Sequence, residues 1–201
     1  MKDVLASETE DTYETYCGKL DVLLADMPDG TSQRIYARGP NSTGQYYGAG
    51  NVVAVLSKIL GTSASLIGLS PDPRDTTNGL WRMLKDNGKW QPVEWINPPM
   101  ELGTEYRTTE RYFGKPVYVK TVDFGALPNA SYKFVGIENG ASIIRVSALA
   151  SNGKTLSGSI GASQREQVLC MGSSNSVEII TYADASSLTA TVTAWYTKTA
   201  D

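Results

Sequence analysis

The stretch GTEYRTTERYFGKPVYVKTVDFGALPN, from Gly103 to Asn129, decides the fold of the second half of this chain. It is rich in aromatic residues, threonine and valine, which favour the half-buried surface of a β-sheet. The sequence Gly114-Lys115-Pro116 interrupts two runs of this kind and is typical of a turn. We therefore predict a β-hairpin or a bent two-stranded ribbon here.

The remainder of the second half also reads as antiparallel strands separated by short turns. The final strand-like region is predicted to be a long hairpin around Asp184–Ser187, with Val192, Ala194 and Tyr196 on one face of its last strand. About seven short strands in roughly a hundred residues fit a β-sandwich or jelly roll. The strand-like runs after the opening ribbon are ASIIRVSALA (141–150), KTLSGSIG (154–161), EQVLCMG (166–172) and VEIITYADASSLTATVTAWYTK (177–198).

The first half contains a strong local hairpin signal. Asn87-Gly88, the dipeptide most typical of a tight hairpin turn, lies between two strand-like runs that carry Trp81, Trp90 and Trp95. The three indoles could form a platform for sugar rings or could fill the core of a small sheet. We expect the core role, because a small domain needs large side chains to build a core.

The predicted organisation is a two-domain, all-β protein. Residues 1–25 are expected to be a leading segment or the end of a fibre shaft, and residues 26–96 a small β domain. Residues 97–103 contain tandem prolines, which favour an extended linker. Residues 104–201 form the predicted second domain, whose thin core would gain buried surface by trimerisation.

Composition excludes several classes of function. The net charge of −3 argues against a nucleic-acid partner, and no apolar run approaches the length of a membrane span. The 201 residues include no histidine, which removes the commonest general base and metal ligand. We predict no enzymatic activity, no catalytic residues, no metal site and no cofactor. Cys17 and Cys170 are far apart and are expected to be free thiols.

Two segments resemble parts of known tail fibres. The phrase GKPVYVKTVDFGALPN (114–129), with the chain end ATVTAWYTKTAD (190–201), resembles the carboxy-terminal domain of receptor-binding tail-fibre proteins from tailed bacteriophages and prophages. The run from Leu80 to Ile96 resembles the small β knob domain of pyocin-type and phage tail fibres. The resemblance implies a homotrimer at the tip of a tail fibre in the virion, attached to upstream fibre or baseplate proteins.

The resemblance also implies a function in host adsorption, namely binding a cell-surface polysaccharide or wall polymer. Two alternatives stay open. The first is a structural baseplate or shaft module without receptor binding. The second is a carbohydrate depolymerase, which is less favoured because no repeat is visible and the acidic residues show no pairing signature. We read those residues as surface or turn carboxylates: Asp123, Glu138, Glu166, Glu178 and Asp184.

The predicted binding site follows from strict alternation of strand direction in the second domain. Loops 125–131, 151–155 and 172–175 would then lie at the end far from the linker, and loops 138–141, 162–165 and 184–187 at the near end. The far loops would gather polar side chains suited to hydroxyl or phosphate groups, although turns also favour such residues. The predicted ligand-binding residues are Asn129, Tyr132, Asn152, Lys154 and Asn175, with Ser131 and Ser174 beside them.

Overall fold

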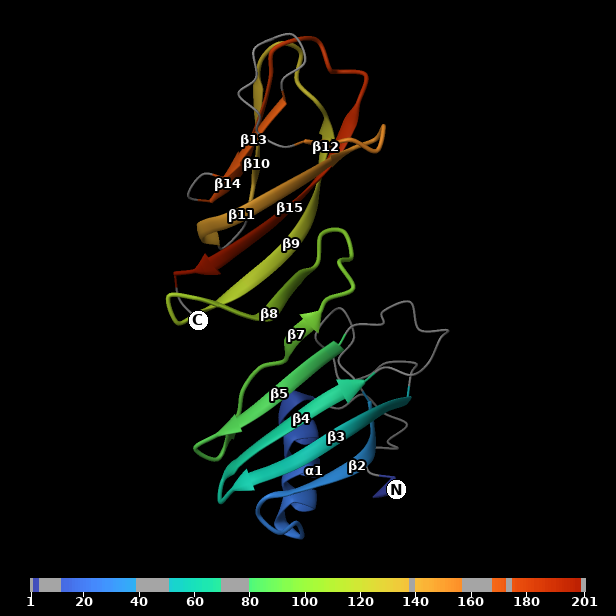
Figure 1. Ribbon diagram of the computed structural model, residues 1–201, viewed down its shortest axis with the longest axis vertical. Helices are drawn as coiled ribbons and strands as arrows, with labels where there is room; N and C mark the ends of the chain where they lie inside the picture. Colours follow the sequence, from blue (N-terminus) through green and yellow to red (C-terminus); the bar gives the residue numbers. More distant parts are fainter. Residues whose placement is uncertain are drawn as a thin grey trace. The chain divides into compact units, whose positions relative to one another are not determined.

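The computed structural model describes residues 2–3, 12–38, 51–69, 80–137, 140–156, 168–172 and 175–199. The chain divides into two compact units, Met1–Pro99 and Met100–Asp201. The described residues lie mostly in β-strands (Figure 1), which confirms the expectation of a β protein, except that a helix is also present. The boundary between the units falls inside the proline-containing segment 97–103.

The first unit contains a twisted sheet with strand order β1-β2-β3-β4-β5-β7, in which β6 pairs with β5. Strand β1 runs parallel to β2, and the other neighbours are antiparallel. The apolar run at 51–60 forms a strand, β3. The strands are β1 (Lys2–Asp3), β2 (Thr31–Arg38), β3 (Asn51–Leu60), β4 (Ser63–Leu69), β5 (Leu80–Asp86), β6 (Lys89–Trp90) and β7 (Glu94–Asn97).

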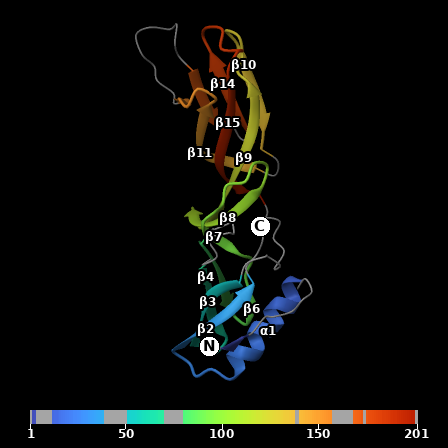
Figure 2. The same ribbon diagram turned by 90° about the vertical axis from the view of Figure 1, so that its right-hand side faces the viewer.

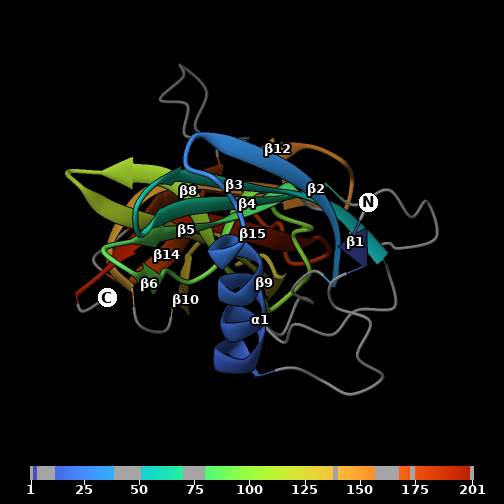
Figure 3. The same cartoon turned by 90° about the horizontal axis from the view of Figure 1, so that it is seen from below.

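Helix α1 (Tyr13–Ala25) lies on one face of this sheet (Figure 2, Figure 3). The hydroxyl of Thr12 caps the helix by accepting the backbone N–H of Thr15 at 3.2 Å. Asp21 accepts hydrogen bonds from Lys85 at 2.7 Å and from the indole of Trp90 at 2.8 Å. These contacts make α1 part of the first unit rather than the separate leading segment expected for residues 1–25.

The buried face of α1 has a regular helical spacing. Tyr16, Cys17, Leu20 and Leu24 are its buried residues, and they face the sheet. Cys17 is a free thiol, as expected, and its burial raises its pKa to about 11. The side chain of Cys170 lies outside the described part of the structure.

The predicted hairpin at Asn87-Gly88 is present. Both residues have positive φ, 48° and 80°, as a two-residue hairpin turn requires. Trp81, Trp90 and Trp95 are all buried, which confirms that they fill the core rather than form an exposed platform.

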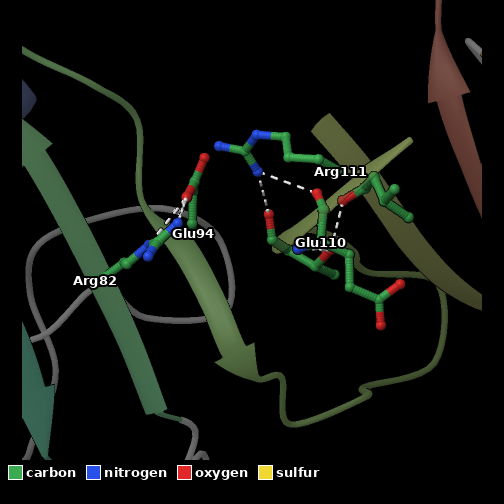
Figure 4. A network of polar contacts seen from close by, with 6 residues as sticks. Arg82, Glu94, Glu110 and Arg111 are labelled. Carbon is green, nitrogen blue, oxygen red and sulfur yellow. Dashed lines mark hydrogen bonds and ion pairs between the residues drawn. The ribbon is translucent and has the colours of Figure 1, made fainter. Parts of the chain in front are cut away.

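A buried ion pair crosses from β5 to β7 in the first unit (Figure 4). Arg82 donates from Nε and Nη2 to one carboxylate oxygen of Glu94, at 3.1 and 3.0 Å. Glu94 is only 3% exposed, so the guanidinium supplies the counter-charge that a buried carboxylate needs. We therefore assign this pair a structural role.

The second unit is built from two sheets. The larger has the order β8-β9-β15-β11-β12, and the smaller has the order β10-β14-β13, with all neighbours antiparallel. The strands are β8 (Glu105–Tyr112), β9 (Lys115–Ala126), β10 (Tyr132–Gly136), β11 (Gly140–Ala150), β12 (Thr155–Leu156), β13 (Val168–Gly172), β14 (Ser176–Thr181) and β15 (Thr189–Lys198).

The two sheets share one hydrophobic core. Strand β15 contributes Val192, Ala194 and Tyr196, which are fully buried on one face as the alternation predicts. Strand β14 contributes Val177 and Ile179 from the other sheet. The predicted β14–β15 hairpin is wrong, because β14 pairs with β10 and β13 while β15 pairs with β9 and β11. The chain crosses between the sheets at residues 182–188.

The opening ribbon of the second unit is a β8–β9 hairpin, with its turn at Phe113-Gly114 rather than at 114–116. Phe113 has a φ of 49° and a side chain that is 90% exposed. Near the turn, the guanidinium of Arg111 folds back and donates to the backbone carbonyls of Thr108 and Glu110, at 3.3 and 3.0 Å (Figure 4). These bonds fix the irregular pairing near the hairpin tip.

Gly68 gives a direct test of packing in the first unit. A Cβ at this position would overlap the indole ring of Trp81. We expect Gly68→Ala to lower the free energy of unfolding by about 1–3 kcal/mol, because the buried Trp81 ring would have to shift to make room for the methyl group. Chemical denaturation followed by tryptophan fluorescence measures this loss.

The matched control is Gly18→Ala, on the exposed side of α1. Apart from its chain neighbours and the backbone of its own helix turn, nothing lies within 4 Å of the point that a Cβ would occupy there, so alanine should stabilise the helix by about 0.5–1 kcal/mol. Equal stability of the Gly68→Ala variant and the unchanged chain would contradict the packing of Trp81 over β4.

Candidate functional site

Three of the predicted ligand-binding residues share one end of the second unit. Strands β9 and β11 finish at this end and β15 begins there, because Ala126 pairs with Thr189 and Ala150 with Ala190. We call it the loop end; it consists of residues 127–131, 151–154 and 182–188. Asn129, Asn152 and Lys154 are exposed on its loops.

Asn175 lies at the opposite end, contrary to the predicted grouping. Its carbonyl accepts the N–H of Ile137 where β10 finishes, at 2.8 Å, whereas Tyr132 starts β10 from the loop end. The predicted position of loop 184–187 is also wrong, because Asp184 forms a β-bridge with Asn129 at the loop end.

The cause is a break in the alternation of strand direction. Both β12 and β13 run away from the loop end, since β12 is antiparallel to β11 and β13 is antiparallel to β14. The described residues of the later loops 172–175 and 184–187 therefore lie at the ends opposite to those predicted. The predicted turn at 162–165 and Ser174 lie outside the described residues. The binding role of the five residues stays a prediction.

Several loop-end oxygens are already used by their own turns. The Oδ1 atom of Asn152 accepts the N–H of Lys154 at 3.1 Å. The Oδ1 atom of Asp184 accepts the N–H and hydroxyl of Ser186, at 3.0 and 2.7 Å, and these bonds lower the pKa of Asp184. Such bonds are typical of turn-forming Asn and Asp. They reduce the capacity of these side chains to bind a ligand.

A shallow depression lies beside the turn 151–154. It has a volume of about 340 Å³ and combines hydroxyl groups, one carboxylate and the 52% exposed side chain of Leu149. None of the described residues that line it is aromatic. The lining residues are Asp123, Leu149, Ala150, Ser151, Gly153, Thr189, Ala190 and Thr191.

A second surface lies on the outer side of the smaller sheet. Tyr132 and Phe134 on β10 are 65% and 51% exposed, and their ring centroids are 5.6 Å apart in an edge-to-face arrangement. On the neighbouring strand β14, Ile180 pairs with Tyr132 and Glu178 pairs with Phe134. We call these four residues the aromatic face.

Alternation along the two strands determines which side chains form the aromatic face. Val177 and Ile179 are fully buried and point into the core, so Glu178 and Ile180 point outward. Tyr132 and Phe134 lie opposite those two residues and therefore occupy the same outer side.

Strand β10 is held in place by the lysine between its two rings. The Nζ atom of Lys133 donates to the carbonyls of Phe124 and Ala126, at 2.6 and 3.2 Å, and lies 4.8 Å from the centroid of the Phe124 ring. This lysine therefore connects the edge strand β10 to β9 and is not directed at the aromatic face. Its contacts fix the strand that carries Tyr132 and Phe134.

Sequence reasoning identifies only Tyr132 of this face. Phe134 is absent from the predicted site, and Glu178 is interpreted there as an isolated surface carboxylate. The pattern Tyr132-Lys133-Phe134 places two rings on one side of a strand, which is the signal that could have found the second ring. The pairing of Phe134 with Glu178, in contrast, depends on tertiary register and cannot be read from the chain.

The described residues contain neither a metal-binding cluster nor a membrane-spanning helix. Within those residues, no group of three or more Cys, Asp or Glu side chains is arranged to hold a metal ion. None of the helices in that part of the chain is long and apolar enough to span a membrane.

Comparisons with known proteins give little further information. No family model matches this chain, and no curated protein matches it. A solved structure that does match is described as the selenomethionine structure of an N-truncated R2-type pyocin tail fiber. The match covers 88% of this chain and 93% of that chain, at 8% identity and a TM-score of 0.28. A TM-score this low does not establish a shared fold.

Variants of Asn152 test whether the turn at 151–154 needs its side chain. We expect Asn152→Ala to lower the free energy of unfolding by about 0.5–1.5 kcal/mol, because it removes the acceptor for the N–H of Lys154. Asn152→Asp keeps this acceptor and should retain most of the stability. Thermal denaturation of both variants measures the difference, and an unchanged Asn152→Ala variant would show that the side chain is not needed by the turn.

Proposed function

We propose that this chain forms the tip of a phage or phage-tail-like fibre and binds a glycan on the surface of a host cell. The aromatic face is the observation that carries the proposal. Tyr132 and Phe134 are more than half exposed on a strand that Lys133 anchors. The resemblance of residues 114–129 and 190–201 to fibre receptor-binding domains supports the virion setting.

The chemistry of the aromatic face suits a sugar. The apolar C–H faces of sugar rings pack against aromatic rings, and a tyrosine hydroxyl can both donate and accept hydrogen bonds. The carboxylate of Glu178 is an acceptor for donors on the same ligand. The loop-end depression is the weaker candidate, because its described lining offers hydroxyl groups and Leu149 but no ring.

A site of this size binds weakly on its own, and fibres overcome this by valency. Two rings and one carboxylate cover little of a ligand, so one copy should bind a short oligosaccharide with low affinity. We propose a homotrimer attached to upstream fibre or baseplate proteins. Three sites per fibre and several fibres per particle would then multiply the weak single-site affinity.

The two alternative functions, a structural module and a carbohydrate depolymerase, predict different roles for the aromatic face. A structural module would cover these rings with a neighbouring chain, so their replacement would impair assembly rather than cell binding. A depolymerase would need a pair of carboxylates across a cleft. Glu178 is paired with Phe134, and the next outward pair is Ile180 with Tyr132, so no second carboxylate lies on the described aromatic face. This arrangement favours binding without cleavage.

Cell binding tests the proposal directly. Fluorescently labelled protein is added to a panel of Gram-positive and Gram-negative cells, with and without periodate oxidation of their surface glycans. We expect Phe134→Ala to reduce binding at least several-fold, because it removes half of the stacking surface. Its melting temperature should stay nearly unchanged, since the ring lies outside the core.

Phe113→Ala is the matched control. It removes an equally large and even more exposed ring from the β8–β9 hairpin and should not affect binding. Full binding by the Phe134→Ala variant would remove the aromatic face from consideration. Binding that survives periodate but is lost after protease treatment of the cells would indicate a protein receptor.

A further inference from the structure

We propose that the aromatic face selects a ligand with a positively charged group, such as the ammonium of a de-N-acetylated amino sugar. This inference rests on the proposed glycan-binding function and specifies its ligand class. It comes from the position of Glu178 beside the two exposed rings.

The charge of Glu178 is not balanced within the described part of the face. Its carboxylate forms no ion pair or hydrogen bond with another described side chain, although the residue is partly buried. The nearby Lys133 donates instead to the carbonyls of Phe124 and Ala126. The strand positions beside Glu178 hold Phe134 on one side and Met171 on the other, neither of which is charged.

A bound ligand would remove water from this carboxylate. Desolvating an ion without a counter-charge is costly, and the hydroxyl groups of a neutral sugar offset that cost only in part. An ammonium group supplies both the opposite charge and three hydrogen-bond donors. A cationic ligand therefore gains more from Glu178 than a neutral one does.

The two aromatic rings, like the carboxylate of Glu178, favour a cationic ligand. The faces of Tyr132 and Phe134 carry negative electrostatic potential and attract a cation within about 6 Å of the ring centre. The edge-to-face arrangement leaves the two rings in different orientations, with an interplanar angle of 72°. One ring can thus stack on the sugar while the other contacts its ammonium group.

The same reasoning excludes an anionic ligand at this face. A phosphate or carboxylate group would approach Glu178 with like charge, and the described face offers no cation to balance it. The expectation from sequence includes phosphate groups of a wall polymer as ligands of the loops. At the aromatic face, the charges favour amino sugars over phosphate polymers.

The experiment compares two hexasaccharides that differ only in acetylation. Fully deacetylated glucosamine hexamer and N-acetylglucosamine hexamer are titrated into the full chain at pH 6, and binding is followed by calorimetry. We expect the glucosamine hexamer to bind about tenfold more tightly. Raising the pH to 9 neutralises much of the ligand amine and should reduce this preference.

Three variants test which residues cause the preference for the glucosamine hexamer. Glu178→Gln should remove most of the difference between the hexamers, leaving the smaller contribution of the rings, and should leave binding of the acetylated hexamer little affected. Phe134→Ala should weaken both. Glu110→Gln, a matched change at an exposed carboxylate that contacts Arg145 on the larger sheet, should preserve the preference.

The outcomes separate this inference from the proposed function. Equal binding of both hexamers, or an undiminished preference in Glu178→Gln, overturns the cationic selectivity while the glycan-binding role stands. Failure of both hexamers to bind also overturns the amino-sugar assignment. Loss of the glycan-binding role itself would instead appear as cell binding by the unchanged chain that survives periodate oxidation of the cell surface.

Discussion

The second unit depends on the hydrophobic core that its two sheets share. Strand β15 pairs with β9 on one side and β11 on the other, and it directs Val192, Ala194 and Tyr196 into the core. Val177 and Ile179 of the smaller sheet pack in the same cluster. A slip of one residue in β15 would place threonines in this core, so the register is strongly specified. The outward positions on both sheets follow from it.

Local patterns predict the strands well and their partners less well. The alternation in TATVTAWYTK identifies the buried face of β15 correctly, because period-two patterns depend only on neighbouring residues. The turn-like sequence before it suggests a hairpin with β14. Turn chemistry shows where a chain bends but not which sheet the next strand joins. Here the backbone of Asp184 pairs with Asn129, and the chain crosses to the other sheet.

The packing of helix α1 in the first unit cannot be predicted from local sequence, for a related reason. The cluster Leu20–Leu24 looks like a short apolar run in an acidic leader, and its period is obscured because Val22 is apolar yet 70% exposed. The buried stripe becomes clear only when Tyr16 and Cys17 are included. The hydrogen bonds of Asp21 to Lys85 and Trp90 depend on a distant hairpin, so no local pattern could reveal them. Tertiary contacts, rather than propensity, decide that this segment belongs to the first unit.

The fold accounts for the polar side chains of the loop end but not for the exposed rings of the aromatic face. Asn152 and Asp184 hold backbone N–H groups in their own turns, so the fold alone accounts for them. Tyr132 and Phe134 have no comparable explanation, because the core beneath them is already filled by Val177, Ile179 and their neighbours. Exposed rings on an edge strand contribute little to stability and favour association with other molecules. The outward placement of these two rings, beside a carboxylate without a partner on the described face, is therefore the feature of this unit on which the proposed ligand binding depends.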